Sequence, residues 1–308
     1  MEKVVLGHMD KQIVKNELLR TCREKYNFQI ERIQKNEQST DKNVYDIYCN
    51  KDRYIMKIYN NIEHTKSMVN LHNKLRLSRI NVPKIITTKE NENYTKILKE
   101  KYIVVYSFIE GKPIEKDIQT GLIDKQTIIS IAQVVKKIHK LTENKNEFNL
   151  PILPFINSSK RKSLLHFDLT KNNILKSHNG KINIIDFDDA KYGDSVCDIA
   201  ILIANLFFSK TYGVDLEGMN EFINEYYSDN FELRKREEPL IKKYAQEWIK
   251  YTLSGHEFNA SLTESFKVKY KLILDFNWRL IWKRNFKKDS LEYLEESIYI
   301  EKTGNILK

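Results

Sequence analysis

The sequence predicts an α+β protein built from a β-rich N-terminal lobe and a larger α-rich C-terminal lobe. Apolar and polar residues alternate in short runs through the first third of the chain, whereas apolar residues recur at helical spacing through most of the rest. A chain of 308 residues is also too long for most single hydrophobic cores. We therefore expect one lobe over residues 1–106 and a second over residues 107–308.

Strand signals dominate the N-terminal lobe. Residues 28–33 and 44–49 alternate apolar and polar side chains, and residues 54–59 follow a polar turn at 50–53. Two strands joined by such a turn predict a hairpin. A further apolar and aromatic run over 102–109 is typical of a buried strand.

Helical periodicity begins within the first lobe and dominates the second. Residues 63–78 place apolar side chains near helical spacing, and Pro83 marks the end of this segment. A longer apolar stripe over 128–141 predicts an amphipathic helix. Two short apolar runs follow, at 164–165 and 182–185, and the rest of the chain is again helical in character.

Composition excludes several classes of protein. The net charge is +10, but lysine is spread along the whole chain, whereas nucleic-acid binders usually concentrate basic residues on one face. The longest apolar stretch, 199–208, is too short to span a bilayer, and the first ten residues lack the apolar run of a signal peptide. Three scattered cysteines suit a reducing compartment better than a disulfide framework or a zinc site. We expect a cytoplasmic protein without nucleic-acid or membrane partners.

Polar side chains cluster directly after the two short apolar runs. Asp168 follows the first run, Asn173 lies five residues further on, and Asp186 follows the second run. If the two runs pair as one hairpin, both carboxylates lie at the same edge. Phosphoryl transfer needs one carboxylate that deprotonates a hydroxyl, and a second carboxylate and an amide oxygen that hold Mg²⁺. Each residue alone is also an ordinary turn residue.

The motif His166-x-Asp168-x-x-x-x-Asn173, followed by Ile-Asp186-Phe-Asp-Asp-Ala, closely resembles the superfamily of aminoglycoside phosphotransferases, choline kinases and type II homoserine kinases. The resemblance implies a protein-kinase-like fold, with Asp168 as catalytic base and Asn173 and Asp186 as metal ligands. A further element, Gly193-Asp194…Asp198-Ile-Ala, follows, and the resemblance makes its second aspartate, Asp198, a brace of the catalytic loop. In such loops His166 is structural.

The resemblance also suggests nucleotide-binding residues in the first lobe. Lys57 is similar to the strand lysine that pairs with the α- and β-phosphates, although a surface lysine on a polar strand face is the alternative. The family commonly supplies a helical glutamate as partner of this lysine. Here that position lies near Asn70 and the closest acid is Glu63, so the partner stays open.

The segment 34–43, where kinases bind phosphate, contains no glycine. Ser39, Thr40 and Asn43 are the candidate phosphate-binding side chains, with a solvated hairpin tip as the alternative.

Residues 106–111 resemble the segment that reads the nucleotide base through the backbone of Ser107 and Ile109. Tyr106 would lie at the back of that pocket, where its bulk disfavours adenine, so either ATP or GTP is the expected donor.

The acceptor is expected to bind the α-rich lobe. Acidic residues, including Glu237, Glu238 and Glu247, accompany aromatic ones, which suits a small cationic acceptor such as an aminoglycoside-type antibiotic. The alternative for Ile241, Tyr244, Trp248 and Tyr251 is one core stripe of a helix, with the glutamates on its solvated face. Other candidate functions are a metabolic kinase for choline, homoserine or a related amino alcohol, and a nucleotide-binding pseudokinase.

Overall fold

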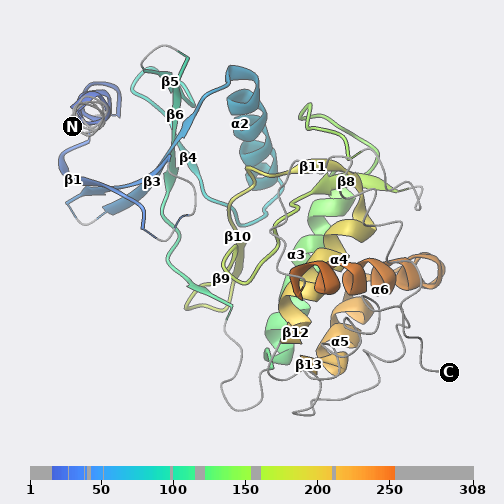
Figure 1. Cartoon of the computed structure of the whole chain (residues 1–308). Coiled ribbons are helices and arrows are strands. Elements are labelled where there is room, and N and C mark those ends of the chain that lie inside the picture. Colours follow the sequence, from blue (N-terminus) through green and yellow to red (C-terminus); the bar gives the residue numbers. More distant parts are fainter. Residues whose placement is uncertain are drawn as a thin grey trace, which may run out of the picture. The chain divides into compact units, whose positions relative to one another are not determined.

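The computed structural model describes residues 16–26, 28–37, 39, 43–50, 52–97, 100–114, 122–153, 161–209 and 213–253. The chain divides into two compact units between Glu110 and Gly111, four residues beyond the predicted boundary. The first unit is built around a β-sheet and the second is mainly helical (Figure 1). The predicted α+β class with a β-rich N-terminal part is confirmed.

The first unit contains one antiparallel sheet. Its strand order is β1-β2-β3-β6-β4, with β5 also paired to β6. The strands are β1 (Ile30–Lys35), β2 (Val44–Cys49), β3 (Asp52–Tyr59), β4 (Ile85–Ile86), β5 (Thr95–Lys96) and β6 (Tyr102–Ser107). The predicted hairpin of β2 and β3 is confirmed. The first strand begins two residues later than predicted, because the register pairs Lys35 with Tyr45 and is irregular near Ile30.

One face of this sheet packs on a helix that covers residues 16–26, which the sequence analysis did not single out. Its contacts come from Leu18, Cys22 and Tyr26, at a spacing of four residues, and these join buried strand residues such as Met56 and Val105 in one core. A spacing of four residues keeps the three side chains on one face of a helix. This periodicity is the sequence signal from which the helix could have been predicted.

The helix predicted over 63–78 is confirmed as α2 (Ile62–Leu77). Asn61 caps its first turn, because its side-chain oxygen accepts the backbone N–H groups of Glu63 and His64. Met68, Leu71 and Leu75 are buried along one stripe.

The second unit consists of four named helices and short strands. The helices are α3 (Lys125–Leu141), α4 (Ser195–Phe207), α5 (Leu216–Tyr226) and α6 (Phe231–Leu253). The strands are β7 (Lys112–Pro113), β8 (Lys162–Leu165), β9 (Ile174–Lys176), β10 (Ile182–Ile184), β11 (Lys191–Asp194), β12 (Phe208–Ser209) and β13 (Gly213–Val214). In the part of the chain that the structure describes, every helix is too short or too polar to span a bilayer.

Helix α4 lies at the centre of the second unit and is buried on nearly all sides. The apolar character of this segment all round its axis is typical of a core helix. Asp194 begins it as the N-cap, accepting the N–H of Val196. Gly193 is required just before this cap, because a Cβ there would lie 2.9 Å from the Cβ of Leu153.

Candidate active site

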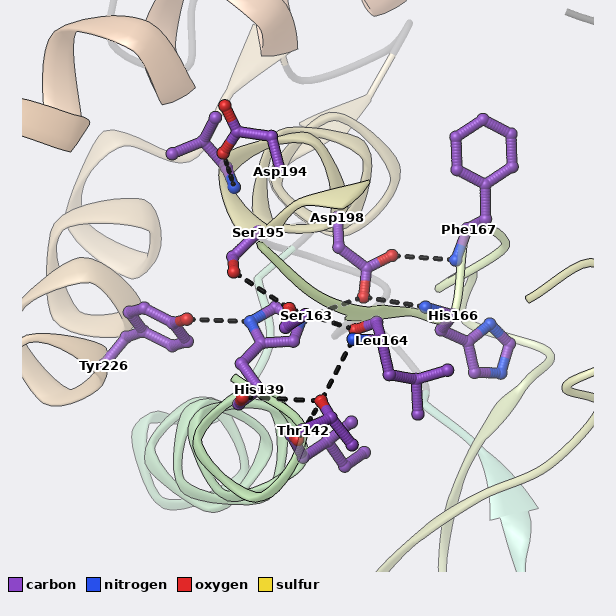
Figure 2. A network of polar contacts seen from close by, with 12 residues as sticks. His139, Thr142, Ser163, Leu164, His166, Phe167, Asp194, Ser195, Asp198 and Tyr226 are labelled. Atoms are coloured by element: carbon purple, nitrogen blue, oxygen red, sulfur yellow. Dashed lines mark hydrogen bonds and ion pairs between the residues drawn. The ribbon is translucent and has the colours of Figure 1, made fainter. Parts of the chain in front are cut away.

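The loop that follows β8 is fastened to α4 by the carboxylate of Asp198. Its Oδ2 accepts the backbone N–H of His166 at 3.0 Å, and its Oδ1 accepts that of Phe167 at 2.8 Å (Figure 2). Phe167 has a φ of 69°, in the left-handed region that non-glycine residues seldom adopt. The bonds to Asp198 hold the backbone in this conformation, so a charged side chain from a later helix shapes the loop.

Asp198 is itself held by a network of polar side chains (Figure 2). Its Oδ2 lies 3.2 Å from Nε2 of His139, a residue of α3, and Nδ1 of His139 lies 2.7 Å from the hydroxyl of Tyr226 on α5. Arg161 donates to the same hydroxyl oxygen at 3.1 Å. An ionised carboxylate can only accept, so Nε2 of His139 donates to Asp198, and the ring of His139 connects this carboxylate to the hydroxyl of Tyr226.

The side chain of Asp198 is only 1% exposed. Burial by itself acts to raise its pKa, but the hydrogen bond and charge of His139, the charge of His166 and the N–H of Phe167 prevail and lower the pKa below its usual value. The carboxylate of Asp198 therefore stays ionised to a lower pH than an ordinary aspartate does.

Asp168 and Asn173 contact each other within this loop. Nδ2 of Asn173 donates to the backbone oxygen of Asp168 at 2.9 Å and to its Oδ2 at 2.6 Å. The N–H of Thr170 donates to the same backbone oxygen at 2.8 Å and closes the turn. Among the described residues, no donor reaches Oδ1 of Asp168 or Oδ1 of Asn173. Both oxygens are chemically suited to a ligand.

Asp186 follows a different hairpin from the predicted one. β10, which leads to Asp186, pairs with β9, whereas β8 pairs with β11. The prediction that the runs before Asp168 and Asp186 pair with each other is wrong, because β10 pairs with β9, which is nearer along the chain, and β8 pairs with the more distant β11. The two segments meet through other bonds. Nε2 of His166 lies 2.8 Å from the oxygen of Ile185, whose N–H donates to the oxygen of Asn173 at 3.0 Å.

The charges near Asp168 set its protonation. Burial raises the pKa of the Asp168 carboxyl, and the nearby carboxylates Asp186 and Asp189 raise it further. His166 and the hydrogen bond from Asn173 act in the opposite direction without cancelling the increase. A carboxylate with a raised pKa is a stronger base, as expected of a group that takes a proton.

The predicted metal ligands Asn173 and Asp186 form a small set of oxygen donors. None of the described His, Cys, Asp and Glu side chains form a group of three or more arranged as a metal site. Asn173 and Asp186 offer oxygen ligands on neighbouring segments. Mg²⁺ accepts so small a set, because it keeps several waters and uses one or two carboxylates together with phosphates.

In the first unit, Lys57 lies on β3, paired with Val44 of β2 and Val104 of β6. Glu63, the closest acid in the sequence, forms an exposed ion pair with Lys66 at 3.0 Å in the first turn of α2. The partner of Lys57 therefore stays open.

The predicted phosphate-binding segment is shorter than expected, because Gln34 and Lys35 belong to β1. Within the remainder, the N–H of Ser39 donates to Oδ1 of Asn36 at 2.9 Å. The backbone oxygen of Asn43 accepts from Ile58 at 3.0 Å. Thr40 lies outside the described residues.

The segment expected to read the base follows β6. The N–H of Ser107 already donates to the oxygen of Lys84 at 2.7 Å, so it is not available to a base. Ile109 is half-buried in the loop that follows. Tyr106 is 3% exposed and its hydroxyl lies 3.1 Å from that of Tyr59, so its ring is part of the core of this unit.

The acids expected to bind a cationic acceptor are engaged within the protein. Glu237 is fully buried and accepts from Arg161 at 2.7 Å and from Tyr227 at 2.8 Å. Glu238 pairs with Arg234 and Lys242 on its own helix. The side chain of Glu247 and everything from residue 254 onward lie outside the described residues. Ile241 is fully buried, as in the alternative interpretation of this stripe as helix core.

Residues 147–234, which contain the loop, Asp186 and Asp198, match the model of the phosphotransferase enzyme family. This match confirms the predicted resemblance. It also confirms the enzyme class, a phosphotransferase with a hydroxyl acceptor. The sequence has no significant match among curated proteins.

Solved structures of small-molecule kinases share the fold. An amicoumacin kinase in complex with AMP-PNP and Ca²⁺ is 16% identical, with a TM-score of 0.61 over 99% of this chain and 97% of its own. A microcompartment-associated aminopropanol kinase is 14% identical, with a TM-score of 0.61 over 92% and 96% of the two chains. The choline kinase of Streptococcus pneumoniae is 15% identical, with a TM-score of 0.51 over 87% and 100%. The predicted protein-kinase-like fold of small-molecule kinases is confirmed.

Proposed function

We propose that the chain transfers the γ-phosphate of ATP or GTP to a hydroxyl of a small cationic acceptor, and that aminoglycoside-type antibiotics are the favoured class. The observation that carries this proposal is the pair of hydrogen bonds from Asn173 to Asp168. They join a candidate base and a candidate metal ligand in one loop, which is bonded through Ile185 to the segment of Asp186.

In this proposal Asp168 is the general base. Its Oδ2 is held by Asn173, and its Oδ1 accepts the hydroxyl of the acceptor. A hydroxyl is a poor nucleophile until a base orients it and takes its proton. The raised pKa of Asp168 strengthens this role.

Asn173 and Asp186 would hold Mg²⁺, which supplies shielding of the phosphate charge when bound. Lys57, Ser39, Thr40 and Asn43 would contact the phosphates. The carbonyl of Ser107 and the backbone of Ile109 remain candidates for hydrogen bonds to the nucleotide base. The similar structures contain AMP-PNP in one kinase and GDP in another, which supports a nucleotide donor of either kind.

The preference for a cationic acceptor rests on the negative charge around Asp168. Asp186 and Asp189 are exposed carboxylates close enough to Asp168 to raise its pKa, and a positively charged acceptor would be attracted to them. The names of similar kinases include spectinomycin, kanamycin, aminopropanol and choline, all of them nitrogen bases or cations.

A metabolic kinase for choline, homoserine or a related amino alcohol is the second candidate, favoured by the fold shared with choline and aminopropanol kinases. We place the activity in the cytoplasm, in keeping with the free thiols of Cys22, Cys49 and Cys197, with no nucleic acid or membrane as partner.

A phosphorylation screen tests the proposal directly. Aminoglycosides, other amine antibiotics, choline, homoserine and simple amino alcohols are offered with ATP and with GTP, and nucleoside diphosphate release is followed. Turnover of an amine acceptor is expected. Efficient turnover of a neutral or anionic acceptor, with no amine substrate found, would overturn the choice of acceptor. Nucleotide binding without any transfer would favour a pseudokinase.

A further inference from the structure

A carboxylate is buried in the middle of an apolar strand of the first unit. Strand β2 reads Val-Tyr-Asp-Ile-Tyr-Cys, and its Asp46 is 3% exposed. Aspartate is depleted in strands, and a buried charge is costly unless it is paired. Asp46 therefore needs partners close by.

Two side chains supply these partners, and all of their bonds converge on Oδ1. Arg53 of the neighbouring strand β3 donates through Nε at 3.0 Å and through Nη2 at 2.8 Å. Asn36, just beyond the end of β1, donates through Nδ2 at 3.3 Å. Asp46 is thus shared between two segments that approach it from opposite sides.

Asn36 connects Asp46 to the phosphate loop, which we define by its described residues Asn36, Glu37, Ser39 and Asn43. Its backbone N–H donates to the oxygen of Val44 at 2.9 Å, which closes the base of this loop. Its side-chain oxygen accepts the N–H of Ser39, also at 2.9 Å. The sequence of this loop contains no glycine. The bond between the Asn36 side chain and the N–H of Ser39 stabilises its first turn.

Arg53 connects Asp46 to the base segment, which we define as residues 107–109. Its guanidinium lies over the ring of Phe108, 4.1 Å from the ring centre, and its backbone oxygen accepts the N–H of Phe108 at 3.3 Å. The base segment is thus held to β3 by both the backbone and the side chain of one residue.

The connection runs along the side of the sheet that carries Lys57. In antiparallel pairs, directly opposed residues place their side chains on the same face. Val44 opposes Lys57 and Asp46 opposes Ile55, so Asp46 and Lys57 share that face. Asp46, whose partners lead to the phosphate loop and to the base segment, therefore lies on the same side of the sheet as Lys57.

We propose that Asp46 is a positioning residue that couples the phosphate loop to the base segment. This inference rests on the proposed function, since it assigns the two segments to one nucleotide. A nucleotide whose base is bound by residues 107–109 then finds Asn36 and Ser39 already arranged near its phosphates, because Arg53 and Asn36 share one carboxylate.

Comparing the affinity for a nucleoside with that for its triphosphate shows whether a change beside the base segment alters the binding of the phosphates. The ratio of the two Kd values measures what the phosphates add to affinity, and it is determined by calorimetry with Mg²⁺ for whichever of ATP and GTP binds better. Arg53→Met removes the ion pair beside the base segment, and every bond of Arg53 to Asp46 and Phe108 lies outside the described residues of the phosphate loop. We expect it to reduce the ratio about tenfold, as for the loss of a hydrogen bond to a charged group.

Asn36→Ala should reduce the same ratio, and the double variant should reduce it no further, because both side chains act through Asp46. A ratio that is unchanged in Arg53→Met, or two losses that multiply in the double variant, would overturn the coupling. The matched control is Lys25→Met, which breaks an ion pair with Glu90 elsewhere in the unit and should leave the ratio as it is.

Thermal unfolding shows whether each variant is folded. If Arg53→Met is unfolded, Arg53→Lys replaces it. Lysine keeps the charge but cannot contact Asp46 through two nitrogens, so the ratio of Kd values should again fall, and an unchanged ratio would overturn the coupling. The outcomes also separate the two proposals. If the unaltered chain binds no nucleotide, the proposed function fails and the coupling fails with it. If it binds normally and the ratio does not respond to Arg53, the coupling alone fails.

Discussion

At the scale of single residues, Asp168 of the loop after β8 and Asp198 of α4, which holds that loop, have opposite properties. The pKa of Asp198 is lowered, because donors and positive charges prevail over its burial. The pKa of Asp168 is raised, because burial and the neighbouring carboxylates Asp186 and Asp189 prevail over His166 and Asn173. Asp198 is kept charged and holds the backbone, and the raised pKa of Asp168 is in keeping with its proposed role as base.

Replacing Asp168 with asparagine tests its role as base. Asp168→Asn should lower kcat by about 10²–10⁴, because an amide can orient a hydroxyl but cannot take its proton. KM for the nucleotide should change little, and the unfolding temperature at pH 7 should not fall, because the raised pKa means that the ionised carboxylate costs stability there. Steady-state kinetics and calorimetry measure both, with Asp229→Asn as an exposed control. A wild-type kcat would remove Asp168 from the mechanism.

The pH dependence follows from the same shifts. As pH falls, Asp168 is protonated above the usual aspartate value of 3.8, whereas Asp198 stays charged below it, so kcat should fall before the fold is lost. Asp189→Asn removes a negative charge that raises the pKa of Asp168, and should move the acid limb of the kcat profile to lower pH. Circular dichroism over the same range checks the fold. An acid limb that coincides with unfolding, or does not move in the variant, contradicts this assignment.

At the scale of elements, the catalytic loop depends on helices that are distant in the sequence. His139 of α3, Asp198 of α4 and Tyr226 of α5 form a chain of bonds that ends at the backbone of His166 and Phe167 (Figure 2). Beyond Tyr226 the chain continues to Arg161 and to the buried Glu237 of α6. Helix packing therefore determines the position of the loop.

Tyr226→Phe tests this dependence. The hydroxyl is hydrogen-bonded to Nδ1 of His139 and accepts from Arg161, which keeps its bonds to Glu237. Its removal takes this partner from the buried Nδ1 of His139 and should cost about 1–3 kcal/mol of stability. We also expect a lower kcat with little change in nucleotide KM, because His139 is then less constrained to donate to Asp198.

The matched control for this variant is Tyr227→Phe, which removes the neighbouring hydroxyl that bonds to Glu237 but has no bond to His139. It should lose stability without the loss of kcat. Equal effects of the two variants on kcat would show that Tyr226 acts only through stability.

At the scale of the whole molecule, binding of a nucleotide with Mg²⁺ should stabilise the native chain by mass action. At one hundred times Kd this amounts to about 2.7 kcal/mol, which is measured as a rise in the unfolding temperature. Asp186→Ala should abolish the part of the rise that depends on Mg²⁺, since the metal loses its candidate carboxylate. Lys181→Ala, at an exposed site on the turn of the same hairpin, is the control. An undiminished dependence on Mg²⁺ in Asp186→Ala would reject Asp186 as a ligand.

The sequence by itself determined the class of fold, most of the strands of the first unit, and the set Asp168, Asn173 and Asp186. These follow from local periodicity and from a motif with fixed spacing, and both are written in neighbouring residues. The α+β fold and the match over residues 147–234 confirm the class of fold and the family resemblance, whereas the roles of Asp168, Asn173 and Asp186 stay predictions.

Only the tertiary structure decided which segments pair and which polar groups meet. β8 finds β11 instead of β10, Glu237 turns inward to Arg161, and His139 reaches Asp198 from a different helix. Asp46 likewise serves two segments that no local pattern connects. The physical reason is that a buried charge takes the partners that packing brings within hydrogen-bond distance, and packing depends on contacts between residues far apart in the chain.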